Sequence, residues 1–159
     1  MLFRSEGNTA KVAKEIARQT GAALYEIKEA EPYPSVYRDC IKRAQKELQS
    51  KARPAIKGDV PDLSEYKTVY LGYPNWWGDA PMVVYTFLEK AKIDGKAVLP
   101  FCTHEGSGLG STARNLAKAF PKAKVEQKGL QKNFFFQALL RISEPRFFVW
   151  NFPTRSSYK

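Results

Sequence analysis

The chain is poor in the residues that mark disulfide-rich and metal-binding proteins. Its 159 residues include two cysteines and one histidine. Two cysteines are too few for a disulfide framework, and they do not form a C-x-x-C pair. A zinc site built on the usual histidine and cysteine ligands therefore has few candidates. We interpret Cys40 and Cys102 as buried structural thiols.

Long apolar runs are missing as well. No segment approaches the roughly 18 consecutive apolar residues that a membrane span requires. The N-terminal stretch carries charges from Arg4 onward and lacks the apolar core of a signal peptide. With 43% hydrophobic residues, the composition is that of a globular protein. We expect a soluble, cytoplasmic protein with one main domain.

Acidic residues are scarce relative to basic ones. Lysine and arginine number 26 against 16 aspartates and glutamates, which gives a formal charge of +10. The cations are interleaved with glutamates along helical patterns, which is typical of solvated helix faces. We therefore expect no specific nucleic-acid partner, although the charge favours anionic partners in general.

Apolar periodicity predicts helices and strands that alternate along the chain. Strands that alternate with helices pair in parallel, so the pattern predicts a three-layer α/β sandwich. A helix whose apolar face includes Val12 follows Gly7, and it ends near Gly21. The other expected elements are strands at 24–27, 68–73, 97–101 and near 125, and helices from about 37 to 48, 81 to 89 and 112 to 119.

Three loops, at residues 4–9, 74–79 and 103–110, fall at the carboxyl ends of expected strands. In open α/β sheets ligands bind at that edge, so the three loops predict one site. The first loop opens directly into a helix, whose free amides suit a phosphate group. A plain helix N-cap by Asn8 or Thr9 is the alternative.

The second loop places Trp76 and Trp77 beside Gly78. An indole could stack on a planar ligand while the other packs inward, and the glycine lets the backbone approach the ligand edge. Alternatively, both tryptophans belong to the core or to a partner surface.

The third loop contains three glycines and several small polar residues. It lacks the G-x-G-x-x-G spacing of a dinucleotide fingerprint and the G-x-S-x-G spacing of a nucleophile elbow. Backbone amides that contact the edge of a ligand are the better interpretation.

Together the three loops resemble those of flavodoxin, particularly a bacterial flavodoxin-like group with a double tryptophan. The resemblance runs from about residue 3 to 130 and is densest at residues 71–78 and 100–108. It implies a five-stranded parallel sheet in the order 2-1-3-4-5. It also implies a non-covalently bound FMN that carries the redox chemistry, with neither catalytic side chains nor a metal.

The resemblance also implies how the cofactor is held. The first loop would bind the phosphate, and the isoalloxazine would stack on Trp76 or Trp77. The Gly78–Asp79 peptide would bond to flavin N5, and the third loop would contact the pyrimidine edge. The implied FMN-binding residues are Ser5, Gly7, Asn8, Thr9, Pro74, Asn75, Trp76, Trp77, Gly78, Asp79, Thr103, His104, Glu105, Gly106, Ser107 and Gly108.

The start of the chain departs from the family pattern. Only residues 1–3 precede Arg4, so the resemblance implies a truncated first strand in the centre of the sheet. Arg4 and Glu6 stand where the family has small hydroxyl residues. A glutamate that faced the phosphate would cost about 1–4 kcal/mol per unit charge pair.

The end of the chain departs as well. We predict a flavodoxin-like domain at residues 1–131 and a divergent segment at 132–159, which holds eight aromatic residues and five basic residues against one acid. This segment is interpreted in three ways. It is an amphipathic segment that contacts a membrane surface or a partner, a final strand near 134–136 with an unusual helical tail, or the product of a shifted reading frame.

The sequence thus predicts an FMN-binding electron-transfer protein that serves redox partner proteins of unlike charge. An FMN-dependent NAD(P)H quinone or flavin reductase is one alternative. The other is a remnant that has lost flavin binding and serves as an interaction module.

Overall fold

The computed structural model describes residues 8–103, 108–129 and 146–151. The elements predicted from the sequence are confirmed to within a few residues, and one further strand follows them. In chain order they are α1 (Asn8–Thr20), β1 (Ala23–Ile27), α2 (Tyr37–Ser50), β2 (Thr68–Pro74), α3 (Met82–Lys90), β3 (Ala97–Thr103), α4 (Thr112–Ala119), β4 (Lys124–Val125) and β5 (Arg146–Asn151).

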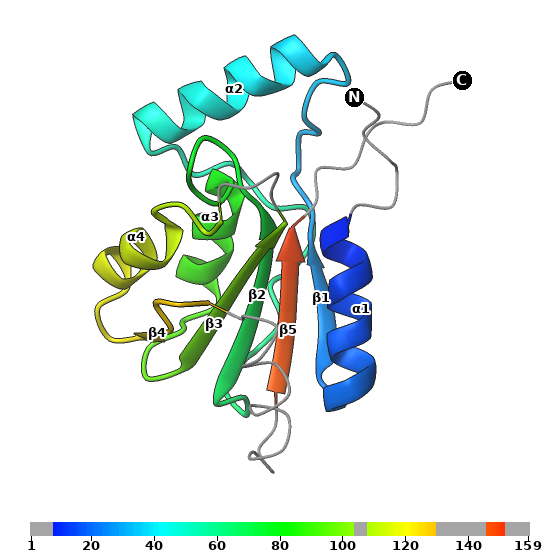
Figure 1. The fold of residues 1–159 in the computed structure, drawn as a ribbon, viewed down its shortest axis with the longest axis vertical. Helices are drawn as coiled ribbons and strands as arrows, with labels where there is room; N and C mark the ends of the chain where they lie inside the picture. The colour runs from blue at the N-terminus through cyan, green and yellow to red at the C-terminus, as the bar shows by residue number, and fades with distance from the viewer. Residues whose placement is uncertain (1–7, 104–107, 130–145, 152–159) are drawn as a thin grey trace.

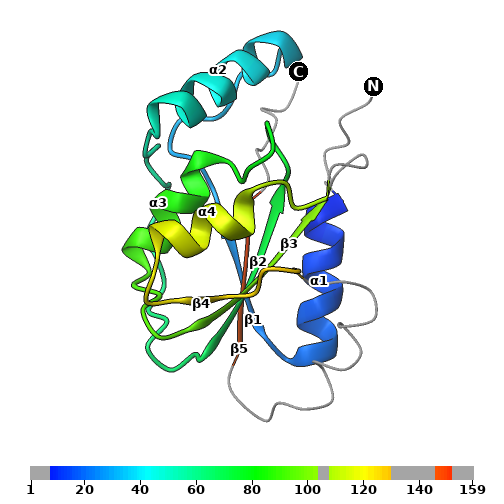
Figure 2. The same ribbon diagram turned by 60° about the vertical axis from the view of Figure 1, so that its left-hand side comes forward.

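The strands form one parallel sheet in the spatial order β1-β5-β2-β3-β4 (Figure 1). Helix α1 covers one face, and α3 and α4 cover the other (Figure 2). The predicted α/β sandwich with a parallel sheet is therefore confirmed.

The strand order differs from the predicted 2-1-3-4-5 at one position in the sheet, which is held by a different part of the chain. The predicted order places the first strand of the chain between the next two, but in the described part of the chain that position is held by β5. Phe147 lies between Ala23 and Val69 in the register. β5 fills this position with six residues.

The residue types of β5 have high strand propensity, and Phe147 and Val149 are buried. The segment at 132–159 was predicted to lie outside the domain, and its residues 146–151 belong to the sheet. The boundary predicted at residue 131 stays a prediction. The final strand suggested near 134–136 lies outside the described residues.

The core lies on both faces of the central strand β2, which is buried from Thr68 to Tyr73. On one face, Leu71 belongs to a large cluster with Val83 and Phe87 of α3. On the other face, Ile16 of α1 packs in a smaller cluster with Tyr70 and Phe101. Val12 was predicted on the apolar face of α1 but is 39% exposed, because it lies at the margin of the buried stripe.

Helix α2 does not lie flat on the sheet. It crosses above the carboxyl ends of the strands, near the start of α3 (Figures 1 and 2). This position places α2 beside the loop that follows β2. None of the helices in the described ranges combines the length and the apolar character needed to cross a bilayer.

The packing of β5 gives a first testable prediction. The Phe147 ring is 5% exposed and lies 4.9 Å from the Tyr66 ring and 6.4 Å from the Tyr25 ring, measured between centroids. Phe147→Ala should lower the free energy of unfolding by about 3–5 kcal/mol, because it removes a buried aromatic and leaves a cavity. Urea denaturation measures this loss.

Phe147→Leu keeps much of the volume and serves as the control, with an expected loss of about 1–2 kcal/mol. A loss below about 1 kcal/mol for Phe147→Ala would show that β5 is not held between β1 and β2 in solution.

Candidate functional site at the carboxyl edge of the sheet

The start of α1 and the ends of β2 and β3 meet at one edge of the sheet. Pro74 and Thr103 are partners in the register, and the Asn75 backbone N–H donates to the Thr103 carbonyl at 3.2 Å. The hydroxyls of Thr9 and Thr103 lie 2.6 Å apart, and Thr9 is fully buried. The described ends of the three predicted loops therefore converge.

The side chain of Asn75 ties the second loop to the third. Its Nδ2 donates to the Gly108 carbonyl at 2.7 Å, and its Oδ1 accepts from the Gly78 N–H at 3.0 Å. The Gly78 carbonyl in turn accepts from the Ser111 N–H at 2.7 Å. Two hydrogen bonds, one from Asn75 to Gly108 and one from Ser111 to Gly78, thus join the second loop to the third loop and to the residue that follows it.

The aromatic loop is a tight turn from Trp76 to Asp79. Trp76 N–H donates to Asp79 O at 2.8 Å, and Asp79 N–H donates back to Trp76 O at 3.1 Å. The central residues Trp77 and Gly78 have φ of +55° and +82°, as a type I′ turn requires. A bulky residue in this region costs about 1–3 kcal/mol, and such strain persists where the surroundings enforce it.

The two indoles occupy different environments. Trp76 is partly buried, and its ring meets the Tyr33 ring edge to face, with centroids 5.0 Å apart. Trp77 is 54% exposed, and its Nε1–H donates to the Ile41 carbonyl of α2 at 3.3 Å. Trp76 therefore packs inward, and Trp77 presents its ring to solvent.

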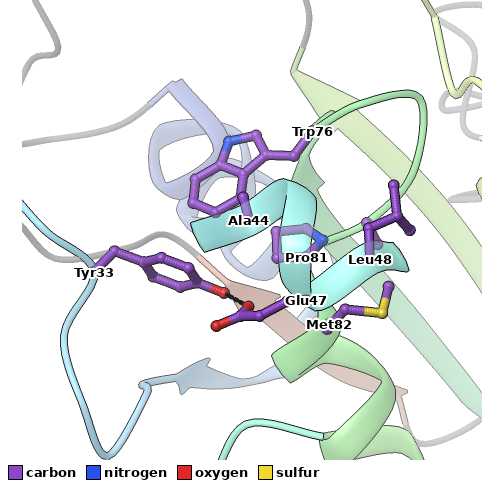
Figure 3. Close-up of a pocket in the computed structure, with 8 residues that line it drawn as sticks. Tyr33, Ala44, Glu47, Leu48, Trp76, Pro81 and Met82 are labelled. Carbon is purple, nitrogen blue, oxygen red and sulfur yellow. Dashed lines mark hydrogen bonds between the residues drawn. The ribbon is translucent and has the colours of Figure 1, made fainter. Parts of the chain in front are cut away.

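A small cleft of about 10 Å³, room for about one water molecule, lies between α2 and the aromatic loop (Figure 3). It is smaller than the roughly 300–1,000 Å³ of typical ligand pockets. Its residues support Trp76 rather than offering space for a tricyclic ring. They are Tyr33, Ala44, Glu47, Leu48, Trp76, Ala80, Pro81 and Met82.

Tyr33 is fixed in this cleft by two charged residues. Its hydroxyl donates to Glu47 at 2.5 Å, as Figure 3 shows. The Arg43 guanidinium donates to the same carboxylate at 2.8 Å and lies 4.5 Å from the centre of the Tyr33 ring. Burial, and then the hydrogen bond to Glu47, raise the pKa of Tyr33 well above its usual value, so the phenol stays a donor.

The Asp79 side chain points into the protein. The buried carboxylate accepts from the Ala80 N–H at 2.7 Å, from the Tyr85 hydroxyl at 3.0 Å and from Asn115 Nδ2 at 2.7 Å. Burial, and then the charge of Asp79, raise the pKa of Tyr85. Asp79 thus anchors the aromatic loop to α3 and α4. No local sequence pattern pointed to its partners Tyr85 and Asn115.

Cys102, the next-to-last residue of β3, is a half-buried thiol that donates to the Gly108 carbonyl at 3.0 Å. Burial raises its pKa to about 11, so it stays protonated at neutral pH. This arrangement agrees with the structural role interpreted from the sequence.

Several predicted site residues lie outside the described part of the chain, and Asn8 is described only as the first residue of α1. The residues outside are Ser5, Gly7, His104, Glu105, Gly106 and Ser107. For these residues the predicted contacts with a ligand stay predictions.

The family model described as flavodoxin matches residues 1–140. The chain belongs to the flavodoxin family. A search of curated proteins gives no match.

Solved structures agree with the family assignment. A protein of Bacteroides eggerthii assigned to the flavoproteins is 32% identical, with a TM-score of 0.73 over 88% of this chain and 93% of that chain. A second one, from Bacteroides uniformis, is 28% identical, with a TM-score of 0.70 over 93% of this chain and 85% of that chain.

A flavoprotein of Lactobacillus acidophilus, solved in complex with FMN, is 19% identical, with a TM-score of 0.66 over 93% of this chain and 87% of that chain. At this identity the likeness shows the fold. Membership of the flavodoxin family is in line with the FMN cofactor predicted from the sequence.

The close approach of the second and third loops gives the next prediction. A Cβ on Gly110 would lie 2.3 Å from the Gly78 carbonyl oxygen, and Gly110 has a φ of +59°. Gly110→Ala should therefore lower the free energy of unfolding by about 2–4 kcal/mol, the sum of a steric clash and backbone strain. Thermal or urea unfolding measures the loss.

Gly21→Ala is the matched control. Gly21 has a similar φ of +66°, but nothing lies within 4 Å of the added Cβ. Its expected loss is about 1 kcal/mol, from backbone strain alone. Equal losses for both variants would mean that the two loops are not in contact.

Proposed function

We propose that this member of the flavodoxin family binds FMN non-covalently at the carboxyl edge of its sheet and acts as an electron carrier. The observation that carries the proposal is the convergence of three segments, joined by the Thr9–Thr103 contact and by the Asn75 bridge to Gly108. When bound, FMN supplies the redox chemistry, and the protein positions it and adjusts its potential.

The start of α1 suits the phosphate end of the cofactor. α1 is 13 residues long and has no acidic residue in its first turn, so its dipole and free amides favour an anion at this end. The Thr9 hydroxyl is engaged with Thr103. We therefore assign phosphate binding to backbone amides around Gly7, Asn8 and Thr9, with the Ser5 hydroxyl as a further donor.

The aromatic loop suits the ring end. Trp77 offers an exposed indole face, whereas Trp76 is held against Tyr33. We therefore assign the stacking contact to Trp77. The sequence alone left this contact open between Trp76 and Trp77. The strained turn holds Trp77 outward, and the Gly78–Asp79 peptide beside it would meet the flavin at N5. The third loop would contact the pyrimidine edge through residues 103–108.

The described part of the edge suits a carrier better than a stand-alone enzyme. The Asp79 carboxylate is engaged by hydrogen bonds from within the protein, and the Cys102 thiol is protonated. Neither group is placed to transfer protons to a substrate. The two free cysteines suit a reducing compartment such as the cytoplasm.

Titration of the purified chain with FMN, followed by quenching of flavin fluorescence, tests the proposal. We expect binding of one FMN per chain. Trp77→Ala should weaken it by roughly 5- to 150-fold, because stacking of a flat base on an aromatic side chain contributes about 1–3 kcal/mol.

Leu24→Ala serves as the control, because Leu24 is partly exposed on β1, away from the three loops, and should leave the affinity unchanged. A chain that stays colourless after incubation with FMN would overturn the proposal. Consumption of NAD(P)H by the loaded protein alone would favour a reductase over a carrier.

A further inference from the structure

We infer that the outer face of α2, together with the adjoining Trp77, is a docking surface for an acidic redox protein. The inference rests on the proposed function, since it supplies the route by which electrons would reach the bound cofactor. It concerns a surface of this chain that holds no predicted FMN ligand other than Trp77.

The first observation is a stripe of positive charge on α2. Arg38, Lys42 and Lys46 follow one another at a spacing of four residues, so they lie along one face of α2. We call these three residues the basic stripe. All three are exposed, and no ion pair to any of them is found within the described residues. Asp39 lies three positions before Lys42, but no ion pair joins the two.

The basic stripe differs from the basic surface of α1. There Glu15 lies between cations and accepts from Arg18 at 2.6 Å, so the charges compensate one another. On α2, like charges at four-residue spacing repel and disfavour the helix. A partner that brings carboxylates to this face would relieve the repulsion.

The second observation is that exposed apolar side chains gather beside the basic stripe. The large hydrophobic residues that are more than half exposed in the described chain are Val36 at 55%, Tyr37 at 54% and Trp77 at 54%. Val36 and Tyr37 lie at the start of α2. The hydrogen bond from Trp77 Nε1 to the Ile41 carbonyl places the indole against the same helix, within two turns of Tyr37.

The aromatic residues and Arg38 are of the types enriched in protein interfaces, and Lys42 and Lys46 suit the polar rim of such a surface. Complementary charge steers the encounter and speeds association more than it strengthens the final complex. A small surface of this kind suits the brief contacts of electron-transfer partners. Since α2 crosses the carboxyl edge (Figure 1), a protein docked on it lies close to the proposed flavin site.

The test measures binding of two redox proteins of opposite charge to the FMN-loaded chain by calorimetry at low and at physiological salt. An oxidised, acidic plant-type ferredoxin is the expected ligand, and a basic cytochrome c is the counter-probe. We expect the ferredoxin to bind and to weaken with salt. Arg38→Ala/Lys42→Ala should weaken ferredoxin binding at low salt by about fivefold or more.

The matched control is Lys90→Ala/Lys118→Ala, which removes the same charge from the last turns of α3 and α4, at the opposite end of the sheet. It should leave ferredoxin binding within about twofold of the parent chain. Equal weakening in both variants would overturn the inference, because the effect would then follow net charge alone. Absence of ferredoxin binding at low salt, or preferential binding of cytochrome c or of anionic lipid vesicles, would overturn it too.

FMN titration of the same variants separates this inference from the proposed function. Neither pair includes a proposed FMN ligand, so FMN affinity should be unchanged in both. The ferredoxin titration is also run on the chain without FMN. If FMN fails to bind but ferredoxin binding still depends on the basic stripe, the function is wrong and the docking surface stands.

Discussion

The insertion of β5 between β1 and β2 is the interaction on which the rest of the structure depends. Parallel strands satisfy their backbone groups only through neighbours on both sides, and β5 is the described neighbour that β1 and β2 share. It also forms much of the surface on which α1 packs. Without β5, the start of α1 would lose part of the surface on which it packs at the carboxyl edge. The three loops would then no longer be held in fixed positions relative to one another.

The candidate site at this edge of the sheet is held together by hydrogen bonds that join its loops to one another and to the helices. Asn75 joins the second loop to Gly108, and Asp79 joins it to α3 and α4. These contacts offset the strain of Trp77 at positive φ, which alone costs about 1–3 kcal/mol. The result is an indole fixed in an exposed position, which is a costly arrangement unless something covers the ring.

Much of the architecture could be predicted from the sequence, because it follows from local patterns. The strands β1, β2 and β3 are apolar runs bounded by turns, and α1 and α2 show helical spacing of apolar residues. The family motifs then located two of the three loops that converge. The sequence could not show which of Trp76 and Trp77 packs inward and which faces solvent. That depends on Tyr33 and α2, which lie some forty residues away in the chain.

The strand β5 could not be predicted, for a different physical reason. A short apolar run buried on both faces has no period of its own, so its state depends on which neighbours it finds. Here the neighbours are separated from it by more than seventy residues. Asn115 and Tyr85 were missed for a similar reason, since a hydrogen bond from a helix to a distant loop leaves no mark on the local pattern.

Native-state hydrogen exchange tests the central claim most directly, because it reports whether β5 is a permanent part of the sheet in the intact chain. If the claim holds, the amides of residues 147–150 that donate to β1 or β2 should exchange as slowly as those of residues 69–72 in β2. Exchange in β5 as fast as in an exposed turn, with β2 still protected, would contradict the account.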